Sequence, residues 1–307
     1  MKTVFFFAAL AVTAVGCASA ELPRPETATR QVVPIPVCTK GLAPPKRAAG
    51  GKAVMRSLEP EEWLEILVPS YEEKRAFDGR ELDCTGHYVF ANDALRWGIP
   101  VRGSFTEEGK PLTIEPDVEV DVHAGPEGMR VLWMRSLRFE NGDIGGPLAL
   151  VRAIDDRAEI YGVGSFRGPD TTKFEMARVG SEAVVVSQEK RCPDQYNCRK
   201  VANFYLARRG RLVQAATADV DRIARIPCVA ERGLYCEYKL RTDVTYEPDG
   251  IHLLEQVRVK VVPTEAKGDR DGDRMLRTAE FTRVLKVERD SLFSSNESLW
   301  ERIVGQE

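Results

Sequence analysis

Cationic side chains face one another across a predicted hairpin and form a possible anion-binding patch. Like charges directly opposite each other destabilise a sheet, so something should neutralise them. An external anion, such as lipid phosphate, an acidic glycan or nucleic acid, is one candidate, and a neighbouring acidic strand is another. A solvated face is the simpler interpretation, because exposed charges commonly have no further role. The four residues of this anion patch are Lys239, Arg241, Arg258 and Lys260.

The hairpin itself is indicated by two runs with a period of two, Cys236–Tyr246 and Ile251–Val261. Alternation of apolar and polar residues is typical of half-buried strands. Asp249 and Gly250 tolerate positive φ, which predicts them as the two central residues of the turn. This register sets two like-charged pairs opposite each other, Arg241 with Arg258 and Lys239 with Lys260.

A third strand, Met275–Glu288, is expected beside the hairpin and would bring Glu280 and Glu288 to the cations. On the other face of the hairpin, Glu255 interrupts the apolar residues and lies opposite Val244 in the predicted register. Glu255 is therefore either near the open end of the sheet or a buried acid with a partner.

Three carboxylates alternate along the predicted strand Leu112–His123, so their side chains project from one face. A solvated face is the preferred interpretation. Carboxylates this close could also bind a divalent ion or raise one another's pKa, as in a hydrolase. The residues are Asp117, Glu119 and Asp121.

An acidic segment resembles a calcium-binding loop, with oxygen ligands at positions one, three, five and twelve. Arg274 stands at position six, where such loops require glycine, and no helix is predicted on either side. A polar turn between two strands is therefore preferred. The four candidate metal ligands are Asp269, Asp271, Asp273 and Glu280.

No cofactor site is predicted. The glycine-rich stretch Gly162–Gly168 precedes a turn and a strand, so it offers no helix N-terminus to a phosphate group. The three histidines, at positions 87, 123 and 252, have no spacing that indicates a metal site or a catalytic triad.

The N-terminus reads as an export signal, with Lys2 before the apolar run Val4–Val15 and small residues after it. Thr13–Cys17 resembles the lipobox of bacterial exported lipoproteins, although Ala14 stands where leucine is usual. The resemblance implies acylation of Cys17 and, since Ala18 rather than aspartate follows, an outer-membrane anchor facing the periplasm or the cell surface. The alternative is cleavage after Ala20 and release as a free periplasmic or secreted protein.

Six cysteines remain once Cys17 is set aside. In an exported chain they predict three disulfides, for which fifteen pairings exist. Closeness along the chain favours Cys38 with Cys84, Cys192 with Cys198, and Cys228 with Cys236.

The domain organisation follows from composition and turn signals. Residues 1–20 are the signal, 21–56 a proline-rich linker, 57–104 a helical or irregular segment, and 105–307 an antiparallel β domain ending in a short helix around Leu299–Val304. Strands spaced by about 8 to 12 residues predict a mainly β fold, an antiparallel sandwich or barrel-like domain preceded by a small helical segment.

A net charge of −3 argues against a general nucleic-acid binder. We therefore expect a non-enzymatic envelope protein that binds or scaffolds another envelope component, a protein or a glycan. The alternative is a secreted hydrolase that acts on glycan or peptide through acids such as Asp117, Glu119 and Asp121.

Overall fold

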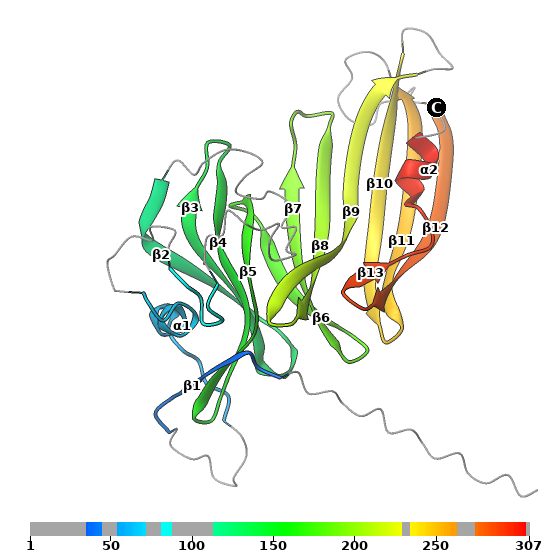
Figure 1. Cartoon of the computed structure of the whole chain (residues 1–307). Coiled ribbons are helices and arrows are strands. Elements are labelled where there is room, and N and C mark those ends of the chain that lie inside the picture. The colour runs from blue at the N-terminus through cyan, green and yellow to red at the C-terminus, as the bar shows by residue number, and fades with distance from the viewer. Residues whose placement is uncertain are drawn as a thin grey trace, which may run out of the picture. The chain divides into compact units, whose positions relative to one another are not determined.

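Most of the molecule consists of strands that follow one another along the chain (Figure 1). The computed structural model describes residues 35–44, 54–71, 81–87, 113–228, 234–262 and 274–304, which all belong to one unit, Val33–Glu307. Several predicted features lie outside the described residues, namely the signal with Cys17, most of the linker, and Asp269, Asp271 and Asp273.

The described elements are two α-helices, a short 3-10 helix and thirteen strands. The helices are α1 (Pro60–Leu67), η1 (Pro126–Gly128) and α2 (Leu299–Val304). The strands are β1 (Cys38–Gly41), β2 (Thr113–Ala124), β3 (Met129–Arg138), β4 (Asp143–Ile154), β5 (Arg157–Pro169), β6 (Lys173–Val179), β7 (Glu182–Arg191), β8 (Cys198–Arg208), β9 (Arg211–Pro227), β10 (Tyr235–Glu247), β11 (Gly250–Val262), β12 (Arg274–Glu288) and β13 (Ser291–Phe293).

The described strands form one large, mostly antiparallel sheet that is not closed. Its main path runs β13-β12-β11-β10-β9-β5-β4-β3-β2, and β8, β7 and β6 extend from β9. β9 makes this branching possible because its 17 residues pair with β8 on one edge and with β10 and β5 on the other. The parallel contact between β5 and β9 makes the sheet mixed. The predicted mainly β class with mostly antiparallel pairing is confirmed, but the described sheet does not close into the barrel-like form that was one of the two predicted alternatives.

The predicted turn of the central hairpin is wrong by one position. Glu247 pairs with Gly250, so Pro248 and Asp249 are the central residues. The φ of proline is fixed near −65°, which suits the second position of a common turn, and proline has no N–H for the ladder. The predicted register would instead have placed Pro248 within the strand.

This change moves every cross-strand partner by two residues and leaves each side chain on its predicted face, because side chains alternate with a period of two. The predicted pairs Arg241 with Arg258 and Lys239 with Lys260 are therefore wrong. The observed pairs are Lys239 with Arg258, Arg241 with Gln256, and Glu237 with Lys260.

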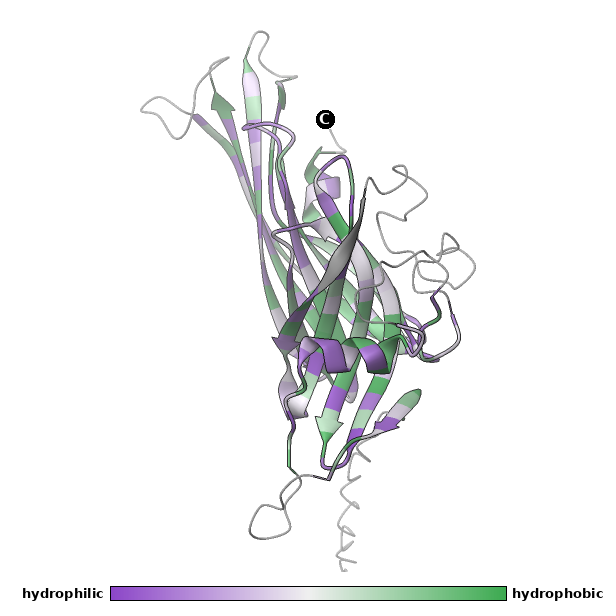
Figure 2. Ribbon diagram, turned by 90° about the vertical axis from the view of Figure 1, so that its left-hand side faces the viewer, coloured by the Kyte–Doolittle hydropathy of each residue, from purple (hydrophilic) through white to green (hydrophobic). Residues whose placement is uncertain are grey.

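The alternation along the strands is visible as purple and green bands in Figure 2. On the apolar face of β10 and β11, buried residues from both strands pack against α2, the predicted C-terminal helix. The main members of this cluster are Tyr238, Leu240, Val257, Val259, Trp300 and Ile303.

Helix α1 lies in the predicted helical or irregular segment 57–104, and it begins with a capping box between Glu59 and Glu62. Its buried side chains Trp63 and Leu67 pack against residues of β3, β4 and β5. Within the described part of the chain, no helix is long and apolar enough to cross a membrane.

Three disulfides join the cysteines within the described ranges, in the pairs that closeness along the chain favoured. They are Cys38–Cys84, Cys192–Cys198 and Cys228–Cys236. Three disulfides indicate an oxidising, extracytoplasmic environment.

Candidate anion-binding pocket

A pocket of ≈ 340 Å³ lies at the predicted anion patch, where β9, β10 and β11 meet. This volume is at the lower end of the range of about 300–1,000 Å³ that is usual for small-molecule sites, so the pocket suits a single small group or ring. Its lining residues are Asp221, Ile223, Lys239, Leu240, Arg241, Gln256 and Arg258.

The sheet register places the lining side chains in two parallel rows, each crossing three strands. Directly opposite residues share a face, and so do residues two apart along a strand, with about 5 Å between strands and about 7 Å between rows. The rows are Ile223, Lys239 and Arg258, and Asp221, Arg241 and Gln256. Three cationic side chains and one carboxylate therefore lie at neighbouring positions of these two rows and give the lining a net charge of +2.

Two of the cations have carboxylate partners. The Lys239 ammonium lies 3.0 Å from Glu237, and the Arg241 guanidinium lies 3.3 Å from Asp243. Arg258 is exposed and lies directly opposite Lys239. Among the residues that the structure describes, no carboxylate pairs with Arg258, so this guanidinium is the cation most open to an external anion.

The fourth predicted residue, Lys260, does not line the pocket. It lies one row away, opposite Glu237, whose side chain also accepts a hydrogen bond of 2.8 Å from Arg225. Burial alone would raise the pKa of Glu237, but the hydrogen bonds from Arg225 and Lys239 outweigh it and lower the pKa. Glu237 is thus an ionised member of a charge network beside the pocket.

The acids expected from the third strand do not neutralise the patch. Glu280 accepts a hydrogen bond of 2.9 Å from the Gln256 amide and, among the residues that the structure describes, forms no ion pair with the arginines. The Gln256 amide nitrogen therefore bonds to β12, and its carbonyl oxygen remains available as an acceptor.

Sequence reasoning missed Asp221, Ile223 and Gln256 as lining residues. Asp221 and Ile223 lie in the second half of β9, which extends to Pro227. The middle of β9 is rich in alanine and lacks a clear alternation, so no local signal indicated that it would reach β10.

Two of the three proposed hydrolase acids are engaged in ion pairs. Arg135 lies 3.1 Å from Glu119 and 3.9 Å from Asp121, and it also pairs with Asp170. The side chain of Asp117 lies outside the described residues. These contacts favour a structural role for Glu119 and Asp121 over an acid–base pair, and within the described ranges no group of three or more ligand-type residues could hold a metal.

Glu255 is the buried acid with partners that the sequence left undecided, and it lies opposite Thr242 rather than Val244. Its carboxylate accepts a hydrogen bond of 2.7 Å from Arg283 and one of 2.6 Å from the backbone N–H of Leu299. It therefore fastens the start of α2 to the apolar face of β11.

The other sequence motifs have structural roles. Gly162–Gly168 is a continuous part of β5 and precedes no helix. His252 lies 2.9 Å from Asp249 in the hairpin turn. The ring of His123 is tilted against that of Phe174, with 5.5 Å between their centroids, and burial lowers the pKa of His123 despite the opposing effect of Asp121.

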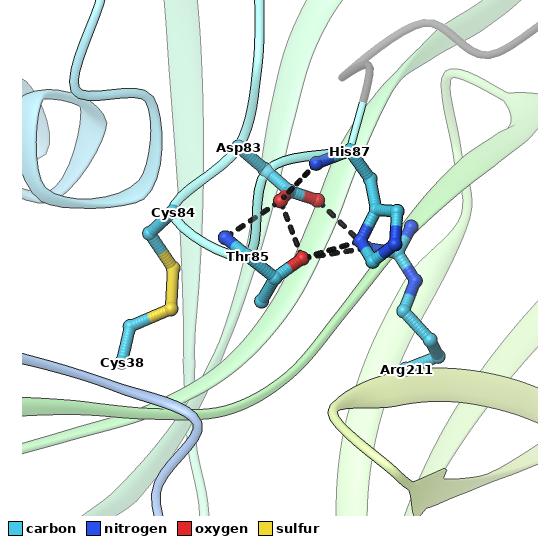
Figure 3. The surroundings of a disulfide bond; sticks show 6 residues. All are labelled: Cys38, Asp83, Cys84, Thr85, His87 and Arg211. Atoms are coloured by element: carbon cyan, nitrogen blue, oxygen red, sulfur yellow. Dashed lines mark hydrogen bonds and ion pairs between the residues drawn. A yellow bond between two sulfur atoms is a disulfide. The ribbon is translucent and has the colours of Figure 1, made fainter.

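A polar cluster beside the Cys38–Cys84 disulfide was not predicted (Figure 3). The Thr85 hydroxyl lies 2.6 Å from His87 Nδ1, which is the contact that a hydroxyl nucleophile makes with its base. The same hydroxyl lies 2.5 Å from Asp83 Oδ1, which also accepts the backbone N–H groups of Thr85 and His87 at 2.8 Å and 3.2 Å. Asp83 therefore closes a local turn rather than orienting the histidine.

Arg211 completes this cluster from the start of β9. Its guanidinium donates to Asp83 Oδ2 at 2.7 Å, and both side chains are nearly buried. The ion pair and the disulfide together tie the segment 81–87 to the sheet. No spacing in the sequence links residues that are 128 positions apart, so the pair could not have been found without the fold.

Comparison of the chain with protein-family models, with curated proteins and with solved structures gives no match.

Proposed function

We propose that this chain is an exported, non-catalytic binding protein of the cell envelope that takes up an anionic group in the pocket between β9 and β11. The observation that carries the proposal is the direct opposition of Lys239 and Arg258 in the wall of that pocket. A cross-strand like-charged pair costs stability, and a bound anion would remove that cost.

The surroundings of the pair support a binding role. Its cations are held by a sheet rather than by a loop. The cations Lys239 and Arg241, which pair with Glu237 and Asp243, are exposed enough to exchange these carboxylates for a ligand. Exposed ion pairs contribute only about 0–1 kcal/mol, so a ligand with better geometry can displace them. Export, lipidation at Cys17 and attachment at the outer membrane are parts of the same proposal.

Inorganic phosphate is a suitable first probe, because it needs only cationic donors. Calorimetric titration of the oxidised mature chain should give binding that weakens with added salt and is lost in Arg241→Glu/Arg258→Glu. Arg157→Glu/Arg289→Glu changes the net charge equally at exposed positions outside the pocket and should bind as the wild type does. Equal loss in both double variants, or binding unchanged in the first, would contradict the proposal.

A further inference from the structure

The pocket wall carries hydrogen-bond acceptors as well as cations. Asp221 is exposed, lines the pocket and, in the part of the chain that the structure describes, makes no ion pair. A carboxylate here repels a ligand that is anionic throughout, such as a polyphosphate, and it accepts hydrogen bonds from a ligand that carries donors.

Gln256 adds a second acceptor on the opposite side of the same row. Because its amide nitrogen donates to Glu280 at 2.9 Å, the carbonyl oxygen of this lining residue remains available as an acceptor. The row of Asp221, Arg241 and Gln256 thus offers two acceptors that flank one cation.

The other row differs in chemistry. It places the cations Lys239 and Arg258 beside the apolar side chain of Ile223. An anionic group suits the two cations, and the C–H face of a ring suits Ile223. The donors that reach Asp221 and Gln256 should be neutral hydroxyls rather than an ammonium group, because the lining has a net charge of +2.

We infer that the ligand of the pocket is an acidic sugar, a ring that bears one carboxylate and several hydroxyls, of the kind found in acidic envelope polysaccharides. The inference rests on the proposed anion-binding function and adds the class of ligand. The carboxylate binds at Lys239 and Arg258, and the hydroxyls donate to Asp221 and Gln256.

The test compares three small probes by calorimetry on the oxidised mature chain: galacturonate, galactose and inorganic phosphate. The affinity for galacturonate should be at least about tenfold higher than that for galactose, which lacks the carboxylate. It should exceed the affinity for phosphate, which lacks the sugar hydroxyls, by a similar factor. Oligogalacturonate binding more tightly than the monomer would point to a polysaccharide as the source of the sugar.

Substitutions at the acceptors separate the two proposals. Asp221→Ala should weaken galacturonate binding about tenfold and strengthen phosphate binding, because it removes an acceptor from one ligand and a repulsion from the other. Gln256→Leu should weaken galacturonate binding alone. Asp156→Ala, at an exposed turn outside the pocket, should change neither affinity.

If phosphate and galacturonate bind equally and Asp221→Ala strengthens both, the sugar inference is overturned while the anion-binding function stands. If neither probe binds, or if Arg258→Gln leaves binding unchanged, both proposals are overturned.

Discussion

Arg258 lines the pocket, and its repulsion with Lys239 lowers the stability of the fold. It is exposed, directly opposite Lys239, and has no carboxylate partner among the described residues. A residue kept for packing or solubility alone could be glutamine or threonine at this position without that repulsion. A role of Arg258 in binding therefore explains its charge better than a role in stability.

Arg258→Gln should consequently raise the free energy of unfolding while it weakens phosphate and galacturonate binding. Removal of one like-charged cross-strand neighbour should add about 0.2–1 kcal/mol, measured by urea denaturation of the oxidised chain. Arg157→Gln, an exposed control, should leave stability within about 0.5 kcal/mol and binding unchanged. A clear loss of stability in Arg258→Gln would mean that the guanidinium has a structural partner.

Glu237 should make the stability of the fold depend on pH in the acidic range. Its pKa is below the ordinary value of 4.5, because the hydrogen bonds from Arg225 and Lys239 outweigh the effect of burial. A lowered folded-state pKa stabilises the fold above the unfolded pKa, and this stabilisation is lost as the pH falls through the folded-state pKa.

Glu237→Gln should therefore lose about 1–3 kcal/mol at neutral pH, and its stability should fall less than that of the wild type as the pH decreases below 4.5. Denaturation midpoints measured between neutral pH and pH 3 test this. Parallel pH profiles for the two proteins would exclude Glu237 as the titrating group. Glu280→Gln, at an exposed acid, should reproduce the wild-type profile.

Among the elements, the β10–β11 hairpin shows what local pattern can and cannot predict. Period-two alternation predicted which side chains share a face, and each face is as predicted. The partners depended on the turn, where the fixed φ of Pro248 outweighed the Asp-Gly signal. The next hairpin back, between β8 and β9, turns at Arg209 and Gly210, which both adopt positive φ.

β9 shows a different limit. Its C-terminal half supplies Asp221 and Ile223 to the pocket, but its alanine-rich sequence has little intrinsic preference for a strand. Pairing with both β8 and β10 stabilises it instead, and such long-range pairing is not encoded in the local pattern. The part of the site on β10 and β11 was therefore predictable, and the part that β9 supplies was not.

At the start of β9, Arg211 should control how firmly the segment 81–87 is held. Removing one partner of a nearly buried ion pair commonly costs about 3–5 kcal/mol. Arg211→Ala should therefore speed amide hydrogen exchange in 81–87, as measured by mass spectrometry with the Cys38–Cys84 disulfide intact. Arg157→Ala should leave exchange there unchanged, and equal protection in both variants would show that the disulfide alone holds the segment.

For the whole molecule, the three disulfides agree with the predicted export, while the anchor at Cys17 stays a prediction. The intact mass of the mature protein, extracted from its native cells without reduction, distinguishes the two forms. A diacyl or triacyl mass on Cys17 is expected, with the six other cysteines protected from alkylation until reduction. A mass that begins at Glu21 would instead establish a freely secreted protein.

The class of the fold was predictable because many short alternating segments favour antiparallel pairing. The branching of the open sheet was not predictable, because it depends on one strand, β9, that pairs with three others. The ion pair between Asp83 and Arg211 was not predictable either, because only the assembled sheet brings these two residues together.

The most direct test of anion binding in the pocket is a titration of the isotope-labelled, oxidised chain with galacturonate, followed by amide chemical shifts. We expect saturable perturbations at residues 221–223, 239–241 and 256–258, and their loss in Arg258→Gln. Perturbations that cluster elsewhere on the sheet, or a spectrum that galacturonate and inorganic phosphate both leave unchanged, would contradict binding at this pocket.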